Sequence, residues 1–363
     1  MVVGLLLASC SSSDQTVGPS LPSSSSSIPT TVDLSTSTVS TTTATSSPTD
    51  DSHAWAYEML GVVEQHAFYA DRVDFSKLRH LAKVTSSARG PQGMYSIALA
   101  ALDELGDRHS HFFNPEEAKS LAQEFADPTP TEVPTAKALD DGVGYLVVPS
   151  VLAFLPSPSG DAYVAATRDT LRQLDVCGWV VDLRANSGGS VDPMLQVVAP
   201  LLGPGTFVGY KDRAGELESL EINADLNVVH HAPTFVVTPP TAALAPAAGS
   251  LAAQAVAVLV GGNTASSAEA IAIAFEGRPR TRFFGEPTAG VPTSNELYTL
   301  SDGSALLLTA AIGVDRAGAT YESQMQPDEL IVQSTSNNAA TPLDNDQAAL
   351  AARAWLHTQP PCD

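Results

Sequence analysis

The spacing of apolar residues divides the chain into a helical first part and an alternating second part. Between residues 53 and 122, HAWAYEMLGVVEQHAF and MYSIALAALDEL carry apolar residues three and four positions apart, which is the spacing of amphipathic helices. The pattern ends in the polar stretch GDRHSHFFNPEEA, and a proline-containing connector, ADPTPTEVP, follows. We therefore expect a small helical subdomain over residues 51–125.

Strand-like and helix-like segments alternate in the second part. VGYLVVPSV and GWVVDLR are typical of buried strands, and the amphipathic stretch DAYVAATRDTLRQL lies between them. The alternation continues with a helix from VDPMLQVVAPLL, strands from FVVTPP and VAVLVGG, and a helix that begins near residue 267. RTRFFGEPTAG and SALLLTAAIGV add strands, and QAALAARAWLH adds a closing helix. This order predicts an α/β core with a mainly parallel sheet over residues 140–358.

The first fifty residues have a different character. MVVGLLLASC joins an apolar run to small residues and resembles a bacterial lipoprotein signal, residues 1–10, whose cleavage exposes Cys10 for lipidation. A chance apolar start is the alternative, because the run is short and no basic residue precedes it. Residues 11–50 are dominated by Ser, Thr and Pro, which favours a disordered linker. We therefore expect a protein of the bacterial cell envelope, outside the cytoplasm, held to the membrane by a lipid anchor or secreted.

Charge and cysteine content exclude several classes of partner. The 18 basic and 40 acidic residues give a net charge of −22, and such a surface repels phosphate backbones, so nucleic acid is not expected as a partner. Besides Cys10, the chain has Cys177 and Cys362, which outside the cytoplasm form either a disulfide or two separate thiols. Two cysteines without suitably spaced histidines make a poor zinc site. We expect no metal and no cofactor.

Two adjacent serines lie where the apolar run AVAVLV gives way to the helical stretch AEAIAIAF. Ser266 or Ser267 can cap the helix, which is a common role for serine at this position. A strand-to-helix turn also exposes a hydroxyl and points free backbone N–H groups at a reacting oxygen. Taken alone, the stretch leaves cap and nucleophile open.

Four stretches together resemble one family. GDRHSHF, DLRANSGG, NTASSAEA, and GEPTAG followed by YESQMQPDEL occur in the order found in the tail-specific, or C-terminal processing, serine peptidases. Relatives of that family include the tricorn core protease and the interphotoreceptor retinoid-binding protein repeats. The resemblance spans about residues 55–355. It implies a crotonase/ClpP-like α/β core behind a helical subdomain, and hydrolysis of a peptide or protein substrate.

The resemblance also implies a nucleophile and an oxyanion hole. In the family, the nucleophile lies three residues before the glutamate of an S-A-x-E motif, and Glu269 therefore selects Ser266. Ser267 then supplies a backbone N–H to the oxyanion. The N-S-G-G turn supplies a second one, with Gly188 as the matching donor and Gly189 as the alternative. An ordinary strand-to-helix turn remains the simpler interpretation of the glycines.

The general base follows from the same comparison. Many members use a lysine twenty-five residues after the serine, but this chain has Val291 there, so we expect no Ser–Lys dyad. The histidine-using branch carries a D-x-H-[ST] segment that places His109 at the catalytic position, with His111 as the alternative. A histidine with a pKa near 6.5 can accept the serine proton and pass it to the leaving amine. Glu322, in YESQMQPDEL, is the nearest match to the glutamate that orients this histidine, although Gln324 stands where the family has a glycine.

Other polar residues are expected to be structural. Asp182 and Arg184 should hold the glycine turn, and Asp107 should cap its loop or pair with Arg108.

The spacing before the core also bears on function. About 35 residues separate His109 from GYLVVP, too few for the PDZ domain usual in processing peptidases, so tail-specific selection is not expected. The sequence thus predicts a serine peptidase that uses Ser266, His109 and Glu322. The alternatives are a binding protein for peptides or apolar ligands on the same fold, and a purely structural envelope lipoprotein.

Overall fold

The computed structural model describes residues 48–362, with the exception of residues 87–88, 127–131, 235–248 and 333–342. The predicted lipoprotein signal with Cys10, nearly all of the predicted linker, and the strand expected from FVVTPP lie outside the described residues. None of the described helices is long and apolar enough to cross a membrane.

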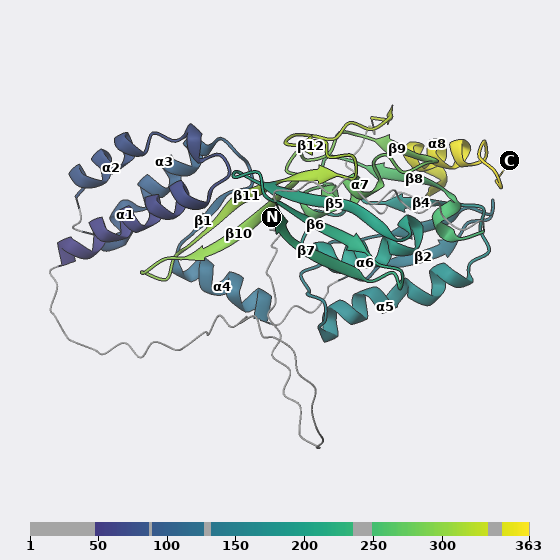
Figure 1. Cartoon of the computed structure of the whole chain (residues 1–363), viewed down its shortest axis with the longest axis horizontal. Coiled ribbons are helices and arrows are strands. Elements are labelled where there is room, and N and C mark those ends of the chain that lie inside the picture. Colours follow the sequence, from purple (N-terminus) through teal and green to yellow (C-terminus); the bar gives the residue numbers. More distant parts are fainter. Residues whose placement is uncertain (1–47, 87–88, 127–131, 235–248, 333–342, 363) are drawn as a thin grey trace, which may run out of the picture.

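The helices predicted for the first part are present and form one end of the molecule (Figure 1). Their bounds are α1 (Pro48–His66), η1 (Ala70–Arg72), α2 (Phe75–Val84), η2 (Gly90–Met94) and α3 (Tyr95–Leu105). The short strand β1 (His111–Phe113) and helix α4 (Pro115–Ala126) follow. Trp55, Met59 and Ile97 lie in the apolar core between these helices. Gly106, with φ +67°, ends α3 and begins the loop that carries His109.

The predicted mainly parallel sheet is also present. Its strand order is β13-β9-β8-β4-β3-β2, and only the β2–β3 pairing is antiparallel. The strands are β2 (Thr135–Ala138), β3 (Gly144–Val147), β4 (Gly178–Asp182), β8 (Ala255–Val260), β9 (Thr281–Gly285) and β13 (Glu329–Leu330). Strands β4 and β8 are buried along their whole length, as expected for parallel strands covered on both faces.

Helices cover both faces of this sheet. They are α5 (Pro158–Gln173), α6 (Val191–Leu202), α7 (Ser267–Phe275) and α8 (Gln347–Leu356). Successive residues of a strand point to opposite faces of the sheet. In β4, Val181 packs into the core formed with α5, α6 and α7, whereas Val180 packs against α8. The mixed α/β class is therefore confirmed, with the helical part in front of it.

A second, antiparallel sheet was not expected from the sequence. Its order is β1-β11-β5-β6-β7, and β10 and β12 also pair with β11. Besides β1, its strands are β5 (Gly205–Asp212), β6 (Leu217–Ile222), β7 (Val228–Thr234), β10 (Thr293–Thr299), β11 (Ala305–Asp315) and β12 (Thr320–Tyr321). Of these, β11 is the strand predicted from SALLLTAAIGV. Leu306 and Leu308 pack into the core of the helical part, while the end of β11 pairs with β5. The long β10–β11 hairpin thus joins the helices to the core (Figure 1).

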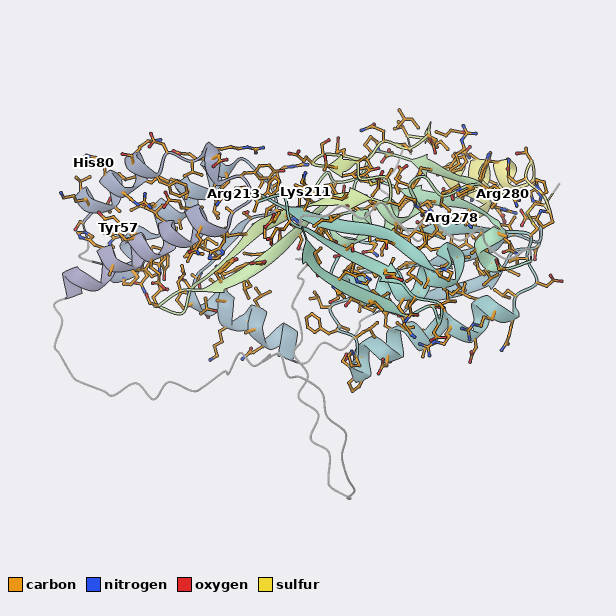
Figure 2. The ribbon with its side chains drawn as sticks, viewed as in Figure 1. Tyr57, His80, Lys211, Arg213, Arg278 and Arg280 are labelled. Atoms are coloured by element: carbon orange, nitrogen blue, oxygen red, sulfur yellow. A yellow bond between two sulfur atoms is a disulfide. The ribbon has the colours of Figure 1, made fainter. Side chains whose placement is uncertain are left out.

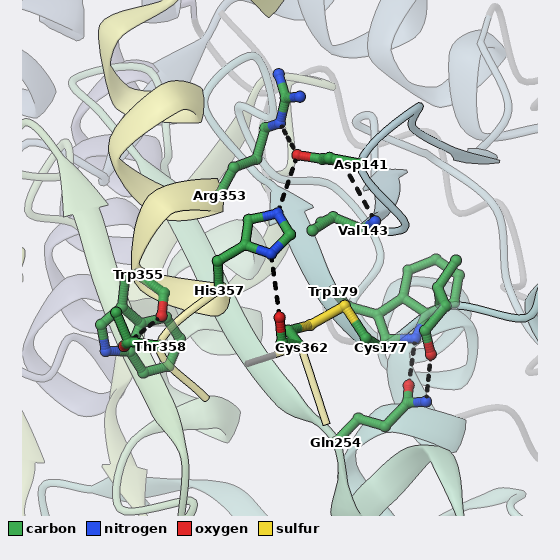
Figure 3. The surroundings of a disulfide bond; sticks show 11 residues. Asp141, Val143, Cys177, Trp179, Gln254, Arg353, Trp355, His357, Thr358 and Cys362 are labelled. Carbon is green, nitrogen blue, oxygen red and sulfur yellow. Dashed lines mark hydrogen bonds and ion pairs between the residues drawn. A yellow bond between two sulfur atoms is a disulfide. The ribbon is translucent and has the colours of Figure 1, made fainter. Parts of the chain in front are cut away.

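A disulfide closes the far end of the core. Cys177, just before β4, and Cys362, beyond α8, are joined with Cα atoms 4.9 Å apart, so the first of the two alternatives for these cysteines is confirmed (Figure 3). Beside the disulfide, Arg353 Nε donates to Asp141 Oδ2 at 2.7 Å, which ties α8 to the turn before β3. The C-terminal helix is therefore fixed to the sheet by covalent and ionic contacts.

Candidate active site

The turn between β8 and α7 holds Ser266 in an unusual backbone conformation. Its φ of 55° and ψ of −122° fall in a region that non-glycine residues rarely adopt, and such strain concentrates at functional sites. The side chain is only 3% exposed. Its Oγ has no hydrogen-bond partner among the described residues, so the hydroxyl makes no N-cap bond in this structure.

Glu269 fixes this turn from inside the protein. Its fully buried carboxylate accepts hydrogen bonds from the backbone N–H groups of Ser266 at 3.1 Å, Gly290 at 2.9 Å and Val291 at 2.8 Å, and from the Thr288 hydroxyl. Burial raises the pKa of Glu269, and these hydrogen bonds act in the opposite direction. The carboxylate therefore holds the serine turn against the 288–291 loop, where Val291 takes part through its backbone.

The glycine turn passes directly beside Ser266. Gly188 has φ +104°, and a Cβ built on it would lie 2.8 Å from the Cβ of Ser266. Gly189 has φ +119°, and a Cβ there would lie 2.0 Å from the carbonyl oxygen of Val151. Both positions therefore require glycine on grounds of space as well as backbone conformation. The glycine turn and Ser266 therefore lie next to each other, as the sequence predicts.

Two backbone N–H groups are expected at the oxyanion hole, those of Ser267 and Gly188. In this structure they differ in whether they already have a hydrogen-bond acceptor. Ser267 is the first residue of α7, and the N–H groups of a first helical turn have no acceptor within their own helix. The N–H of Gly188, in contrast, donates to Oδ1 of Asn186 at 2.8 Å. The Ser267 hydroxyl donates to the carbonyl of Gly189 at 2.6 Å, which ties the turn to the start of α7.

Asp182 and Arg184 have the structural role that the sequence predicts. The Arg184 guanidinium contacts Asp182 at 2.6 Å and Asp346, at the start of α8, at 2.7 Å. The Tyr145 hydroxyl donates to the same Asp182 carboxylate at 2.5 Å. These contacts hold the end of β4 and the residues that lead into the glycine turn.

His109 lies in the loop between α3 and β1 and is held at three points. Its Nδ1 is 2.6 Å from Oγ1 of Thr293, its carbonyl accepts from Nδ2 of Asn295 at 3.0 Å, and its N–H donates to Oδ1 of Asp107 at 2.9 Å. The residue is 6% exposed, and burial lowers the pKa of His109 to about 4. Its Nε2 has no partner among the described residues, so a neutral ring has a free atom to accept a proton.

Asp107 caps the histidine loop, the first of the two roles expected for it. Besides the His109 N–H, its carboxylate accepts from the backbone N–H of Ser110 at 2.6 Å and from the Ser110 hydroxyl at 2.8 Å. Arg108 points elsewhere and donates to the carbonyl of Ala289 at 2.6 Å. The loop is thereby attached to the segment that Glu269 also holds.

The prediction that Glu322 orients His109 is wrong in this structure. The partner of the His109 Nδ1 is Thr293, whereas the Glu322 carboxylate accepts from the Tyr69 hydroxyl at 3.3 Å. Thr293, the first residue of β10, contacts Nδ1, which is the ring atom that an orienting carboxylate would contact. Glu322 lies instead at the edge of a pocket of about 440 Å³ that His109 and Thr293 also line.

Ser266 and His109 are joined only indirectly. Glu269 links the Ser266 backbone to Val291, and Thr293, two residues further on, contacts the imidazole. Among the described residues, no hydrogen bond connects the serine Oγ with the histidine Nε2, and both atoms are buried without partners. Such bonds are often long before substrate binds. No group of three or more potential metal ligands occurs in the described part of the chain.

Comparison with known proteins places the chain among peptidases. The model of the family described as Peptidase family S41 matches residues 142–331, which include the serine and glycine turns but not His109. The nisin-resistance protein of Lactococcus lactis subsp. lactis is 33% identical over 162 residues, covering 44% of this chain and 48% of that protein. The chloroplastic carboxyl-terminal-processing peptidase 2 of Arabidopsis thaliana is 27% identical over 196 residues, 52% of this chain and 33% of that protein. The chain thus spans less than half the length of these curated relatives.

Solved structures share the fold over most of the chain. A lipoprotein from Streptococcus agalactiae superposes with a TM-score of 0.63 and 22% identity, covering 85% of this chain and 96% of that one. The photosystem II D1 C-terminal processing protease superposes with a TM-score of 0.57 and 16% identity, covering 82% and 98%. The helical part and the core are therefore elements of a fold that solved structures also contain.

Proposed function

The chain belongs to peptidase family S41, and on that basis we propose that it is an extracytoplasmic serine peptidase that cleaves peptide bonds through an acyl-enzyme. The observation that carries the proposal is Ser266. Its strained backbone, buried and unpartnered Oγ, and contact with the Gly188 turn are what a nucleophile at a strand-to-helix turn requires.

In the proposed mechanism, Ser266 Oγ attacks the scissile carbonyl carbon while Nε2 of His109 accepts the hydroxyl proton. The backbone N–H groups of Ser267 and Gly188 donate to the oxyanion of the tetrahedral intermediate, which requires Gly188 to release Asn186. His109 then protonates the leaving amine, and water hydrolyses the acyl-enzyme with the same histidine as base. The low pKa of His109 keeps Nε2 free to accept a proton at neutral pH.

We further propose the chain organisation that the sequence predicts. Residues 1–10 act as a lipoprotein signal, Cys10 carries the lipid, and residues 11–50 tether the enzyme. The helical subdomain, residues 51–125, carries the base, and the core, residues 140–358, carries the nucleophile. The structural likeness to a streptococcal lipoprotein agrees with this location. Intact mass of the membrane fraction should show a lipid adduct, and Cys10→Ala should release an unmodified protein.

The substrate proposal is a peptide or protein. The relatives' names indicate two starting points: nisin, from the nisin-resistance protein, and polypeptide C-termini, from the carboxyl-terminal-processing peptidase. Both are assayed best by mass spectrometry of the products, because the masses identify the cleaved bond.

The decisive comparison is between the two adjacent serines. Ser266→Ala should reduce hydrolysis by at least about a thousandfold without unfolding the protein, as loss of a nucleophile does. Ser267→Ala keeps its backbone N–H and should retain measurable activity. If Ser267→Ala is inactive and Ser266→Ala is active, the nucleophile has been assigned to the wrong serine.

A binding protein on the same fold is the second candidate. Two observations favour it: Gly188 donates to Asn186, and Ser266 and His109 do not hydrogen-bond to each other. If the wild-type protein binds nisin or a C-terminal peptide, leaves it intact, and does so equally well as Ser266→Ala, this second function replaces the first.

A further inference from the structure

We propose that Thr293 orients His109, so that a hydroxyl stands where a serine–histidine–acid triad has a carboxylate. The inference rests on the proposed function, since it concerns the base of that reaction. Thr293 is a positioning residue, because it acts through the imidazole of His109.

The contact is short, buried and supported from both sides. Oγ1 of Thr293 lies 2.6 Å from Nδ1 of His109, and the threonine is 8% exposed. Two residues along β10, Asn295 holds the carbonyl of His109, and Asp107 holds its N–H. Thr293 and Asn295 share one face of the strand, because side chains two apart in a strand point the same way. One face of β10 therefore fixes both the ring and the backbone of the histidine.

The hydroxyl can set the tautomer that catalysis needs. A threonine hydroxyl can accept from Nδ1–H or donate to a bare Nδ1, and the proposed role is the first, in which Nδ1–H donates to Thr293 Oγ1 and the lone pair stays on Nε2. Only that tautomer can take the proton of Ser266 through Nε2. Serine at position 293 would preserve this contact, whereas valine, of almost the same shape, would remove it.

A hydroxyl and a carboxylate differ in charge, and the difference has a consequence for pH. A carboxylate beside Nδ1 would stabilise the imidazolium and raise its pKa, whereas the neutral hydroxyl does not. Burial and His111 lower the pKa of His109, and Asp107 partly opposes them. Among the described residues, the titratable or charged groups near the ring come from two places. Asp107, Arg108 and His111 belong to the loop of His109 and the strand after it. Tyr69, Arg72 and Glu322 line the adjoining pocket. The carboxylate of Glu322 hydrogen-bonds to Tyr69 and not to the ring.

The test measures the rate at which a fluorophosphonate probe labels Ser266 between pH 4 and pH 9, on the full chain. Thr293→Val should slow labelling by about 10- to 100-fold, because the tautomer is no longer fixed. Thr293→Ser should stay within about threefold of wild type. Thr293→Asp should move the acidic limb of the profile upward by about one to three pH units. Thermal denaturation of each variant confirms that it folds.

Each outcome decides the question. Labelling of Thr293→Val at the wild-type rate and with the wild-type pH profile would overturn the proposal, as would Thr293→Ser slowed as much as Thr293→Val. If Thr293→Val does not fold, the tautomer of His109 is measured directly instead. The measurement is nitrogen-15 NMR of the histidines in Ser266→Ala, a variant that keeps Thr293. A protonated Nδ1 in His109 is expected there, and a protonated Nε2 at neutral pH contradicts the role. Failure of the proposed function looks different, because then wild type itself is not labelled at Ser266.

Discussion

At the scale of single residues, the contact between Gly188 and Ser266 leaves no room for a side chain. Gly188→Ala would place a methyl group 2.8 Å from the Ser266 Cβ and 2.9 Å from the Ala265 carbonyl oxygen, at a positive φ. We expect at least a tenfold loss of activity and destabilisation by roughly 1–3 kcal/mol. Peptide hydrolysis and chemical denaturation measure the two effects.

Gly262 is the control for Gly188, because it is a glycine of the β8–α7 connection that also carries Ser266. A Cβ on Gly262 meets nothing within 4 Å. Gly262→Ala should therefore change neither stability nor activity appreciably. Equal losses in the two variants would mean that an added methyl group is harmful whether or not it meets neighbouring atoms, and the argument from space would fail.

The buried histidine predicts an acid-sensitive stability. The pKa of His109 is lowered from 6.5 to about 4 in the folded protein, so below pH 6.5 the unfolded state binds a proton that the folded state does not. The stability that this residue contributes is present above pH 6.5 and lost as the pH falls toward 4, by on the order of 3 kcal/mol. Urea denaturation at pH 7 and pH 4 should show a smaller loss in His109→Asn than in wild type. An equal loss would mean that His109 titrates normally.

Single residues also show what the sequence can and cannot predict. Ser266, Glu269 and the glycine turn belong to local motifs, and their spacing alone brings serine and glutamate together on one helical turn. Thr293 contacts His109 from 184 residues away, on a strand whose sequence, TSNELYT, has no distinctive chemistry. No local pattern reports such a contact, and the same limitation led to the wrong assignment of Glu322.

At the scale of elements, Arg213 connects the core to the helical part. Arg213 lies in the turn after β5 (Figure 2). Its guanidinium donates to the carbonyls of Glu64, Gln65 and Ala67, at the end of α1, at 3.1–3.3 Å. A cation at a helix C-terminus also interacts favourably with the helix dipole. Arg213→Ala should destabilise the protein by about 1–2 kcal/mol and slow labelling of Ser266, because the helical part carries His109.

Lys211 is the matched control for Arg213. It is an exposed cation within β5, two residues before Arg213 (Figure 2). No hydrogen bond or ion pair of its side chain occurs within the described part of the chain. Lys211→Ala removes the same charge and should leave stability and labelling unchanged. Similar effects of both substitutions would point to the net charge of the region instead of the contacts with α1.

Elements differ in how well their sequences predict them. The strands β3, β4, β8 and β9 of the parallel sheet and the helices that cover it carry uninterrupted or periodic apolar residues, and the sequence predicts them. The short edge strands β2 and β13 carry no such pattern and are not predicted. In β6, LESLEI, only Leu220 and Ile222 are buried. This strand forms because β5 and β7 pair with its two edges, and a pairing between strands leaves little trace in the hydrophobic pattern of one strand.

At the scale of the whole molecule, the disulfide joins residues 185 positions apart. Closing so long a loop restricts the unfolded chain, and its loss should cost roughly 5 kcal/mol by the chain-entropy argument. The Cys177→Ala/Cys362→Ala variant should therefore denature at a temperature lower by roughly 10 °C or more. Reductant should lower the wild-type Tm similarly and leave that of the double variant unchanged. A Tm insensitive to both would show that the cross-link does not constrain the chain.

The central claim is that Ser266 is a nucleophile activated by His109, and the site of a fluorophosphonate adduct tests it most directly. Peptide mapping by mass spectrometry should find one adduct, on Ser266, in the wild-type protein, none in Ser266→Ala, and strongly slowed labelling in His109→Ala. An adduct on Ser267, or a folded wild-type protein that remains unlabelled, would contradict the account.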